Sequence, residues 1–100
     1  MIEKQQVAQE TQVLRIRVEG RVQGVGFRYF ARAQANRLDL SGFVRNVTDG
    51  SVEAEAMGER ADLERFVAAL ERGPGSGRVE RCVVDWTVSV DTYKDFVIRP

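Results

Sequence analysis

Residues 13–28 read VLRIRVEGRVQGVGFR and contain the change of pattern that decides the fold. The first part alternates apolar and charged side chains, which predicts a half-buried β-strand over residues 13–19. The glycines of residues 20–26 predict a loop. Apolar side chains then recur every three or four positions, so a helix is expected over residues 27–40. The segment is therefore interpreted as a strand, a glycine-rich loop and a helix.

The rest of the chain continues to alternate between strand and helix patterns. Asp49-Gly50 is a strong signal for a tight hairpin turn, and Gly73-Pro74 is a typical helix end. The further elements predicted are a helix over residues 59–72 and strands over residues 43–47, 51–57, 79–88 and 95–99.

This order of elements is the split βαβ pattern of the ferredoxin-like α+β class, a βαββαβ sandwich, with an extra short C-terminal strand. We expect an antiparallel sheet with two helices on one face. The open face is expected to be partly polar and to carry the charged residues Arg15, Arg17, Glu53 and Glu55.

The predicted topology brings two distant parts of the chain to one end of the sheet. The first and second strands run parallel, with the third strand between them, so their carboxyl ends lie together. The loop of residues 20–27 and Asn46, at the end of the second strand, are then about two strand spacings apart, roughly 10 Å. Side chains from both can share one small ligand.

The composition is that of one soluble domain: 100 residues, of which 43% are hydrophobic and 30% charged. Residues 1–12 are polar and are predicted to form a flexible N-terminal arm, and residues 13–100 the folded domain. Fifteen Lys and Arg balance fifteen Asp and Glu, which argues against nucleic acid or acidic membrane as a partner. No apolar run approaches the ~20 residues of a membrane span. A single cysteine fits a reducing, cytoplasmic location.

The chain contains no histidine, which excludes several kinds of catalytic site. A Ser-His-Asp triad, a Cys-His pair and a zinc site of Cys and His ligands all need imidazole. The single cysteine, Cys82, is expected on the core face of its strand with Val84, Trp86 and Val88, and therefore to pack rather than react. An enzyme built from this chain must work with charge, hydrogen bonds and position.

The glycine loop has the features of an anion site. Glycines allow successive backbone N–H groups to turn into one concavity, and the amino end of a helix adds unpaired N–H groups and a positive dipole. Arg28 stands at the helix start, where a cation opposes the dipole unless an anion accompanies it. Its forked donors match two phosphate oxygens. The alternative interpretation is a glycine turn followed by an exposed arginine. The spacing of the glycines alone does not decide between this turn and an anion site. The loop is neither a Walker loop nor a dinucleotide fingerprint.

Asn46 is the second candidate site residue. Asparagine is disfavoured within strands, and Asn46 lies where a strand should leave the sheet beside the glycine loop. Its amide can hold a water through the oxygen and a substrate oxygen through the nitrogen. The alternative is that Asn46 only prepares the following turn, for which Asp49 is interpreted as a turn former. Arg99, near the end of the chain, has two candidate partners: the ligand region and an acidic neighbour.

Two stretches of the sequence resemble the signatures of a known family. Residues 18–28 read VEGRVQGVGFR and residues 42–53 read GFVRNVTDGSVE, and both are similar to motifs of the acylphosphatase family. Gly73-Pro74 and the ending Phe96-Val97-Ile98-Arg99 also resemble the family, so the likeness runs from about Leu14 to Arg99.

The resemblance implies a ferredoxin-like enzyme that hydrolyses acyl phosphates to carboxylate and inorganic phosphate, with no cofactor and no metal. Arg28 matches the family's phosphate-binding arginine, and Asn46 matches the asparagine that positions the attacking water. The backbone amides of the phosphate cradle are matched by Gln23, Gly24, Val25, Gly26 and Phe27. The small-molecule partners implied are an acyl phosphate as substrate and inorganic phosphate as product and inhibitor, and we expect a monomer.

Two rival interpretations remain at this point. One is a non-catalytic module that binds phosphate or carbamoyl phosphate within a larger assembly. The other is an RNA-binding domain with the same strand order, but such domains carry aromatic residues for base stacking on their central strands. Residues 51–55 read SVEAE and are acidic without an aromatic residue, which disfavours RNA.

Overall fold

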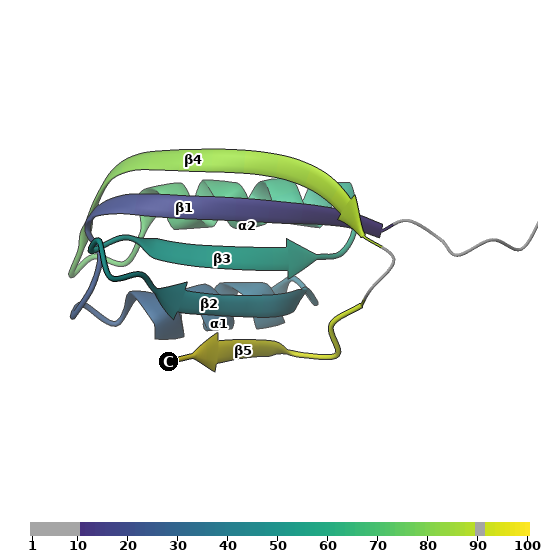
Figure 1. The fold of residues 1–100 in the computed structure, drawn as a ribbon, viewed down its shortest axis with the longest axis horizontal. Helices are drawn as coiled ribbons and strands as arrows, with labels where there is room; N and C mark the ends of the chain where they lie inside the picture. The colour runs from purple at the N-terminus through teal and green to yellow at the C-terminus, as the bar shows by residue number, and fades with distance from the viewer. Residues whose placement is uncertain (1–10, 90–91) are drawn as a thin grey trace, which may run out of the picture.

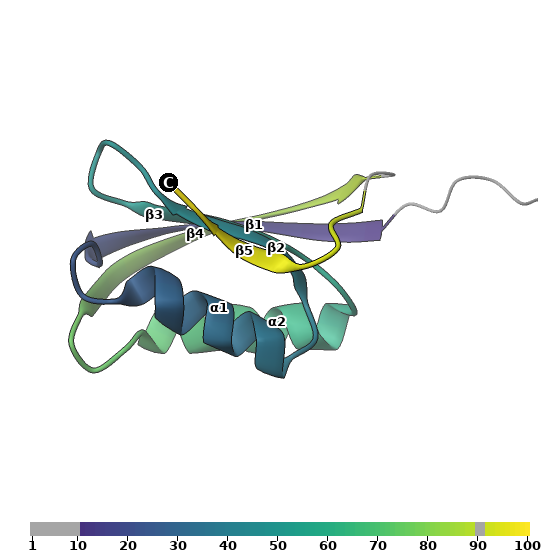
Figure 2. The ribbon, with the colours of Figure 1, turned by 90° about the horizontal axis from the view of Figure 1, so that it is seen from below.

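Residues 11–89 and 92–100 are described by the structure, which is a computed structural model. In chain order their elements are β1 (Thr11–Arg21), α1 (Phe27–Arg37), β2 (Ser41–Asn46), β3 (Val52–Met57), α2 (Arg60–Arg72), β4 (Arg78–Ser89) and β5 (Phe96–Arg99). Figure 1 shows the strands as one sheet, and Figure 2 shows that both helices lie against the same face of it. The predicted ferredoxin-like α+β class is confirmed.

The five strands of the sheet follow the order β4-β1-β3-β2-β5. Strand β3 is antiparallel to β1 and to β2, so these two outer neighbours run in the same direction. Val52 of β3 pairs with Val18 on one side and with Asn46 on the other. The carboxyl ends of β1 and β2 therefore lie at one end of the sheet, as the sequence predicts. The extra strand β5 pairs in parallel with β2 at the edge.

Strand β1 is longer than its alternating pattern indicates. Thr11 and Gln12, which the sequence assigns to the arm, pair with Ser89 and Val88 of β4. Backbone pairing with a long neighbouring strand does not need an apolar side chain, so hydrophobic periodicity misses these positions. The remainder of the predicted arm, residues 1–10, lies outside the described residues.

Helix α1 ends earlier than predicted, at Arg37 rather than at Leu40. The chain reverses at Asp39, whose φ is 58°, and the N–H of Leu40 donates to the carbonyl of Ala35 at 2.9 Å. This is a Schellman-type end, in which the residue after the reversal returns an apolar side chain to the helix. Leu40 is only 5% exposed, so its apolar character, which prolongs the helical pattern, serves the cap instead.

The core lies between the sheet and the two helices. Phe27, the first residue of α1, and Phe66 of α2 are 2% and 0% exposed, and the ring of Phe66 packs edge-on against that of Phe96 with 5.7 Å between centroids. Burying a side chain of this size stabilises the fold by about 1.5–3 kcal/mol. Because Phe27 is held in the core, the start of α1 has a defined position at the end of the sheet.

The inward side of β4 follows the prediction at three positions of four. Cys82, Val84 and Trp86 pack against the core, whereas Val88 is 50% exposed. The guanidinium of Arg60, the first residue of α2, lies 3.6 Å from the centroid of the Trp86 ring. Because the first residue of α2 already lies at Trp86, Val88, two positions further along β4, lies beyond the start of the helix and is exposed.

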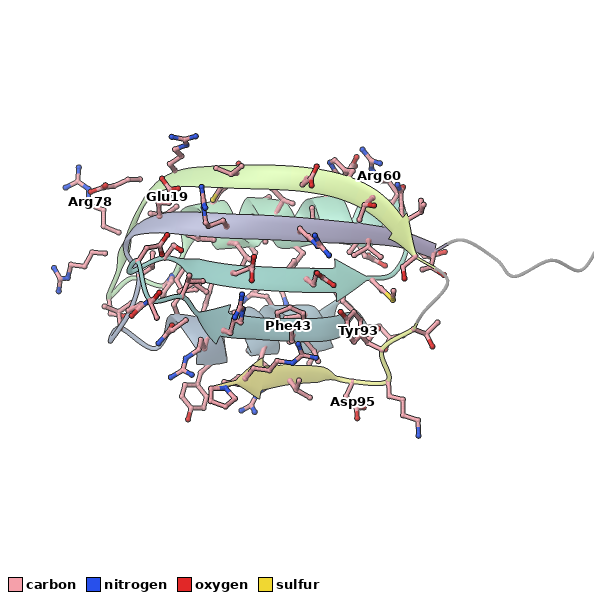
Figure 3. The ribbon with its side chains drawn as sticks, viewed as in Figure 1. Glu19, Phe43, Arg60, Arg78, Tyr93 and Asp95 are labelled. Carbon is pink, nitrogen blue, oxygen red and sulfur yellow. The ribbon has the colours of Figure 1, made fainter. Side chains whose placement is uncertain are left out.

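The open face carries the charges predicted for it. Arg15 Nε lies 2.6 Å from Glu55 Oε2, and Arg45 pairs with Glu53 at 2.7 Å. Figure 3 shows Phe43 and Tyr93 side by side on this face, with 6.1 Å between ring centroids. The Tyr93 hydroxyl donates to Glu55 at 2.6 Å. Exposed ion pairs of this kind contribute about 0–1 kcal/mol each, so they keep the face polar more than they stabilise the fold.

Candidate active site

A cavity of about 220 Å³ opens where β1 and β2 end. It is lined by Val22, Gly24, Gly26, Phe27, Arg28, Tyr29 and Asn46. This volume is several times the ~30 Å³ that one water occupies in the liquid, so a small anion fits. The structure thus brings the glycine loop, the first turn of α1 and the last residue of β2 to one place.

Two glycines of the loop have backbone angles that other residues rarely adopt. Gly24 has φ 75° and Gly26 has φ 77°, and a Cβ built on either would meet nothing within 4 Å. Conformation and not crowding therefore requires glycine at both positions. Left-handed residues in a turn are the conformation in which neighbouring backbone N–H groups gather around an anion.

The amino end of α1 adds further donors. Gly26 is the N-cap, and its carbonyl accepts the N–H of Phe30 at 3.0 Å. The N–H groups of a helix's first turn have no partner within the helix, and the dipole makes this end positive. In the described part of the chain no side chain caps this end, and its first turn contains no acidic residue. The end of α1 that faces the loop is therefore suited to an anion.

Arg28 is the cationic residue of the cavity lining. Its Nη1 donates to the carbonyl oxygen of Arg99 at 3.2 Å, which ties it to the end of β5. None of the ion pairs formed among the described residues involves Arg28. The guanidinium thus has a neutral backbone acceptor, and no carboxylate among the described residues neutralises it.

Asn46 is half-buried, and no described residue hydrogen-bonds to its side-chain amide. The turn that follows is held by other groups: the N–H of Val47 donates to the carbonyl of Ser51 at 2.8 Å, and Asp49 accepts from the N–H and hydroxyl of Ser51. These hydrogen bonds hold the pKa of Asp49 below its usual value. Asp49 is the turn former, as predicted, and the side chain of Asn46 is left for the cavity.

Two residues predicted for the cradle through their backbone amides, Gln23 and Val25, also anchor the loop through other groups. Gln23 Nε2 donates to the carbonyls of Val47 at 2.7 Å and Ser51 at 2.8 Å. Val25 packs against the core, and its carbonyl accepts the hydroxyl of Ser76 at 2.8 Å. The prediction assigned backbone amides to both and missed these anchoring roles. A long amide side chain in a glycine loop, opposite a predicted hairpin, is the signal that could have identified Gln23.

The structure adds Tyr29 and the backbone of Arg99 to the site. Tyr29 lines the cavity and is 64% exposed, and an aromatic residue directly after Arg28 was a visible signal for it. Arg99 contributes its carbonyl to Arg28, while its guanidinium lies 4.0 Å from the centroid of the Phe43 ring. The side chain of Arg99 therefore lies on the open face, and none of the ion pairs among residues 11–89 and 92–100 includes it.

Cys82 has the environment of a packing residue. It is half-buried against the core, and burial raises the pKa of its thiol to about 11. A thiol of this kind is neutral near pH 7 and a poor nucleophile. The chemistry of this chain is therefore to be sought in the cavity at the end of the sheet.

Comparison with known proteins decides the family. Residues 14–98 match the family model described as acylphosphatase. The chain belongs to the acylphosphatase family. A curated acylphosphatase of Salinibacter ruber is 49% identical over 83 residues, which cover 83% of this chain and 87% of the relative. The chain is accordingly an enzyme of acyl phosphate hydrolysis, and an RNA-binding role is set aside.

Solved structures agree with this family. The crystal structure of acylphosphatase from Bacillus subtilis superposes with a TM-score of 0.86 at 39% identity and covers 89% of this chain and 99% of that one. Full-length HypF in its phosphate- and nucleotide-bound form superposes with a TM-score of 0.79 at 30% identity. That match covers 90% of this chain but 12% of HypF, so an acylphosphatase-like unit also occurs inside a much longer protein.

Proposed function

We propose that this acylphosphatase-family chain binds the phosphate of its substrate with Arg28 and the backbone amides of residues 23–27, and orients the attacking water with Asn46. The observation that carries the proposal is that one cavity is lined by both Arg28 and Asn46, with left-handed glycines and the amino end of α1 beside them.

Phosphate binding rests on charge and on donors that are already in place. Arg28 presents forked N–H groups that match two phosphoryl oxygens, and the first turn of α1 presents backbone N–H groups with a positive dipole. Charge on the equatorial oxygens is redistributed as the transition state forms, and preorganised donors stabilise it without rearranging. Because Arg28 has an uncharged backbone partner, no carboxylate in the described chain competes with a phosphate dianion for it.

Hydrolysis then needs a water in line with the leaving carboxylate. The Asn46 oxygen accepts a hydrogen bond from this water, and its nitrogen donates to a phosphoryl oxygen. The water oxygen forms a bond to phosphorus while the bond from phosphorus to the carboxylate oxygen breaks, and the carboxylate leaves with the electron pair. The water's proton passes to an oxygen of the substrate's own phosphate.

We propose that the reaction needs no metal ion. An acyl phosphate is a mixed anhydride, and its carboxylate leaving group is a weak base. The positive charge that a metal would supply to the phosphoryl oxygens comes from Arg28 and the end of α1. Activity is therefore expected to survive a strong chelator.

A second candidate function is phosphate binding without hydrolysis, as a module of a larger assembly. The match to HypF, whose structure contains phosphate and nucleotide, favours this candidate. The curated Salinibacter relative favours the enzyme, because it is named an acylphosphatase and this chain covers 87% of it. Hydrolysis of benzoyl phosphate by the isolated chain separates the two.

We also propose that the enzyme works as a cytoplasmic monomer. A single cysteine and balanced charge support this setting. Within the residues described here, no helix is long and apolar enough to cross a membrane. Light scattering on the purified chain at assay concentration tests the monomer.

The decisive experiment measures steady-state hydrolysis of benzoyl phosphate and its inhibition by inorganic phosphate. Arg28→Ala should lower kcat/KM by about 10²–10³ or more, since it removes a preorganised charged donor. Asn46→Ala should lower kcat far more than it raises the inhibition constant of phosphate. Arg72→Ala and Asn36→Ala, which alter exposed residues of the two helices outside the cavity, are the matched controls.

Three outcomes would contradict the proposal. Wild-type binding of phosphate without hydrolysis would favour the module. Loss of activity in a chelator would overturn the metal-free reaction. An Asn46→Ala variant that lost phosphate affinity as much as turnover would remove the water-positioning role.

A further inference from the structure

An exposed aromatic residue, Tyr29, is among the residues that line the cavity. Tyr29 is 64% exposed, the largest value among the exposed large hydrophobic residues of the described chain, ahead of Val88 at 50% and Val97 at 42%. Unlike those two, Tyr29 lines the cavity together with Arg28 and Asn46. The other apolar residues of the lining, Val22 and Phe27, are 1% and 2% exposed and belong to the core. Tyr29 is therefore the apolar surface that the cavity offers to a ligand.

The ring of Tyr29 contacts a neighbour on its own helix. Arg32, one turn further along α1, places its guanidinium over the Tyr29 ring at 5.4 Å from the centroid. A cation over one face of an aromatic ring is attracted to it electrostatically. Tyr29 is nevertheless 64% exposed as a residue, so most of its surface is accessible to a ligand.

The substrate has two parts, and the site has a place of matching chemistry for each. A phosphate at Arg28 and the amino end of α1 occupies the polar part of the cavity. The acyl group attached to that phosphate must then extend outward from Arg28, and the exposed lining residue Tyr29 directly follows Arg28 on the same helical turn. An apolar or aromatic acyl group covers the exposed ring, whereas an acetyl group is too short to cover much of it.

We propose that Tyr29 binds the acyl group and makes this enzyme prefer aromatic and bulky apolar acyl phosphates over small ones. The inference rests on the proposed function of the cavity, and names the substrate class of that same site. Tyr29 acts on the acyl group alone, so it should leave the binding of free phosphate unchanged.

The test compares kcat/KM for benzoyl phosphate and for acetyl phosphate in four proteins: wild type, Tyr29→Ala, Tyr29→Phe and the control Val97→Ala. Tyr29→Ala should lower kcat/KM for benzoyl phosphate by ~3- to 10-fold, the range expected for losing one aromatic contact. Acetyl phosphate should change less than about twofold. Tyr29→Phe keeps the ring and should keep the preference, and Val97→Ala should behave as wild type. The inhibition constant of inorganic phosphate should be the same in all four.

The outcomes separate this inference from the proposed function beneath it. Equal loss on both substrates, or a changed inhibition constant for phosphate in Tyr29→Ala, would show that Tyr29 only shapes the phosphate cavity and would overturn the preference. An unchanged ratio of kcat/KM for benzoyl phosphate to kcat/KM for acetyl phosphate in Tyr29→Ala would overturn the preference as well. If wild type hydrolysed neither substrate, the proposed function would fall, and the acyl-group role would fall with it. Alanine favours helix at this exposed position, so Tyr29→Ala is expected to fold.

Discussion

Gln23 Nε2 lies 2.7 Å from the carbonyl oxygen of Val47, and this hydrogen bond joins the glycine loop to the chain directly after Asn46. The same nitrogen donates to the carbonyl of Ser51 at 2.8 Å, on the far side of the hairpin. Asn46 is the last residue of β2 and the loop follows β1, with β3 between these two strands, so sheet pairing does not connect the loop to Asn46 directly. The amide of Gln23 supplies a direct connection.

Replacing Gln23 with Ala should therefore reduce turnover more than it reduces stability. Both carbonyls keep a backbone partner, Val47 from Gly50 and Ser51 from Val47, so the loss in unfolding free energy is expected to be about 1 kcal/mol. Misplacing the water relative to the phosphate should lower kcat by about 10- to 100-fold. Urea unfolding and benzoyl phosphate kinetics measure the two effects.

Gln23→Glu is the matched variant, because it keeps the size of the side chain but replaces the donor by a carboxylate that faces two carbonyl oxygens. Gln23→Glu should have both a lower kcat and a lower free energy of unfolding than Gln23→Ala. A Gln23→Glu variant as active as wild type would show that the hydrogen bonds of Gln23 are not needed.

Gly26→Ala should harm phosphate binding through the backbone rather than through crowding. Its φ of 77° costs an alanine about 1–2 kcal/mol, and there is no neighbouring atom within 4 Å to clash with. Gly50→Ala is the control: Gly50 also has a positive φ, of 97°, and open space around it, but it does not line the cavity.

Both glycine variants should lose comparable stability in thermal unfolding, and only Gly26→Ala should raise the inhibition constant of inorganic phosphate. If Gly50→Ala raised the inhibition constant of phosphate to the same degree, the left-handed loop would have no special part in anion binding.

Arg28→Lys separates charge from geometry. Lysine keeps one positive charge but lacks the forked donors, and it cannot reproduce the 3.2 Å contact with the carbonyl of Arg99 while gripping two phosphoryl oxygens. We expect kcat/KM to fall by about 10- to 100-fold, less than in Arg28→Ala. Steady-state kinetics with both variants decide this, and equal losses would mean that charge contributes nothing without the fork.

Cys82 should be unreactive in the folded protein at moderately alkaline pH. Burial raises the pKa of its thiol from about 9 to about 11, so at about pH 8 the thiolate that reacts with a disulfide reagent is scarce. The Cys82 thiol ionises at a lower pH in the unfolded chain than in the folded one. Its ionisation therefore lowers the free energy of unfolding as the pH rises from about 9 toward about 11.

Labelling kinetics with a chromogenic disulfide against pH, in buffer and in concentrated urea, measure both pKa values. The urea sample should titrate at the lower pH. A folded-state thiol that reacts as fast as the unfolded one would show that Cys82 is not packed as described.

Much of the site could be predicted because its signals are local. The alternation before Gly20, the glycines of the loop and the helical spacing after Phe27 each reflect the conformation of a few neighbouring residues. Asn46 at the exit of a strand was conspicuous because asparagine is uncommon within strands. The parallel direction of β1 and β2 followed from the order of the elements and placed the loop and Asn46 at one end.

By itself the sequence determined the element order, the ferredoxin-like class, the family resemblance, and the place of Arg28 and Asn46 at the ends of their elements. The tertiary structure decided that Gln23 ties the loop to the hairpin, that the carbonyl of Arg99 accepts a hydrogen bond from Arg28, and that Tyr29 is an exposed part of the cavity lining. These are contacts between residues far apart in the chain, or surfaces left exposed after packing. Neither leaves a periodic pattern in the sequence, because both depend on how complete elements dock against one another.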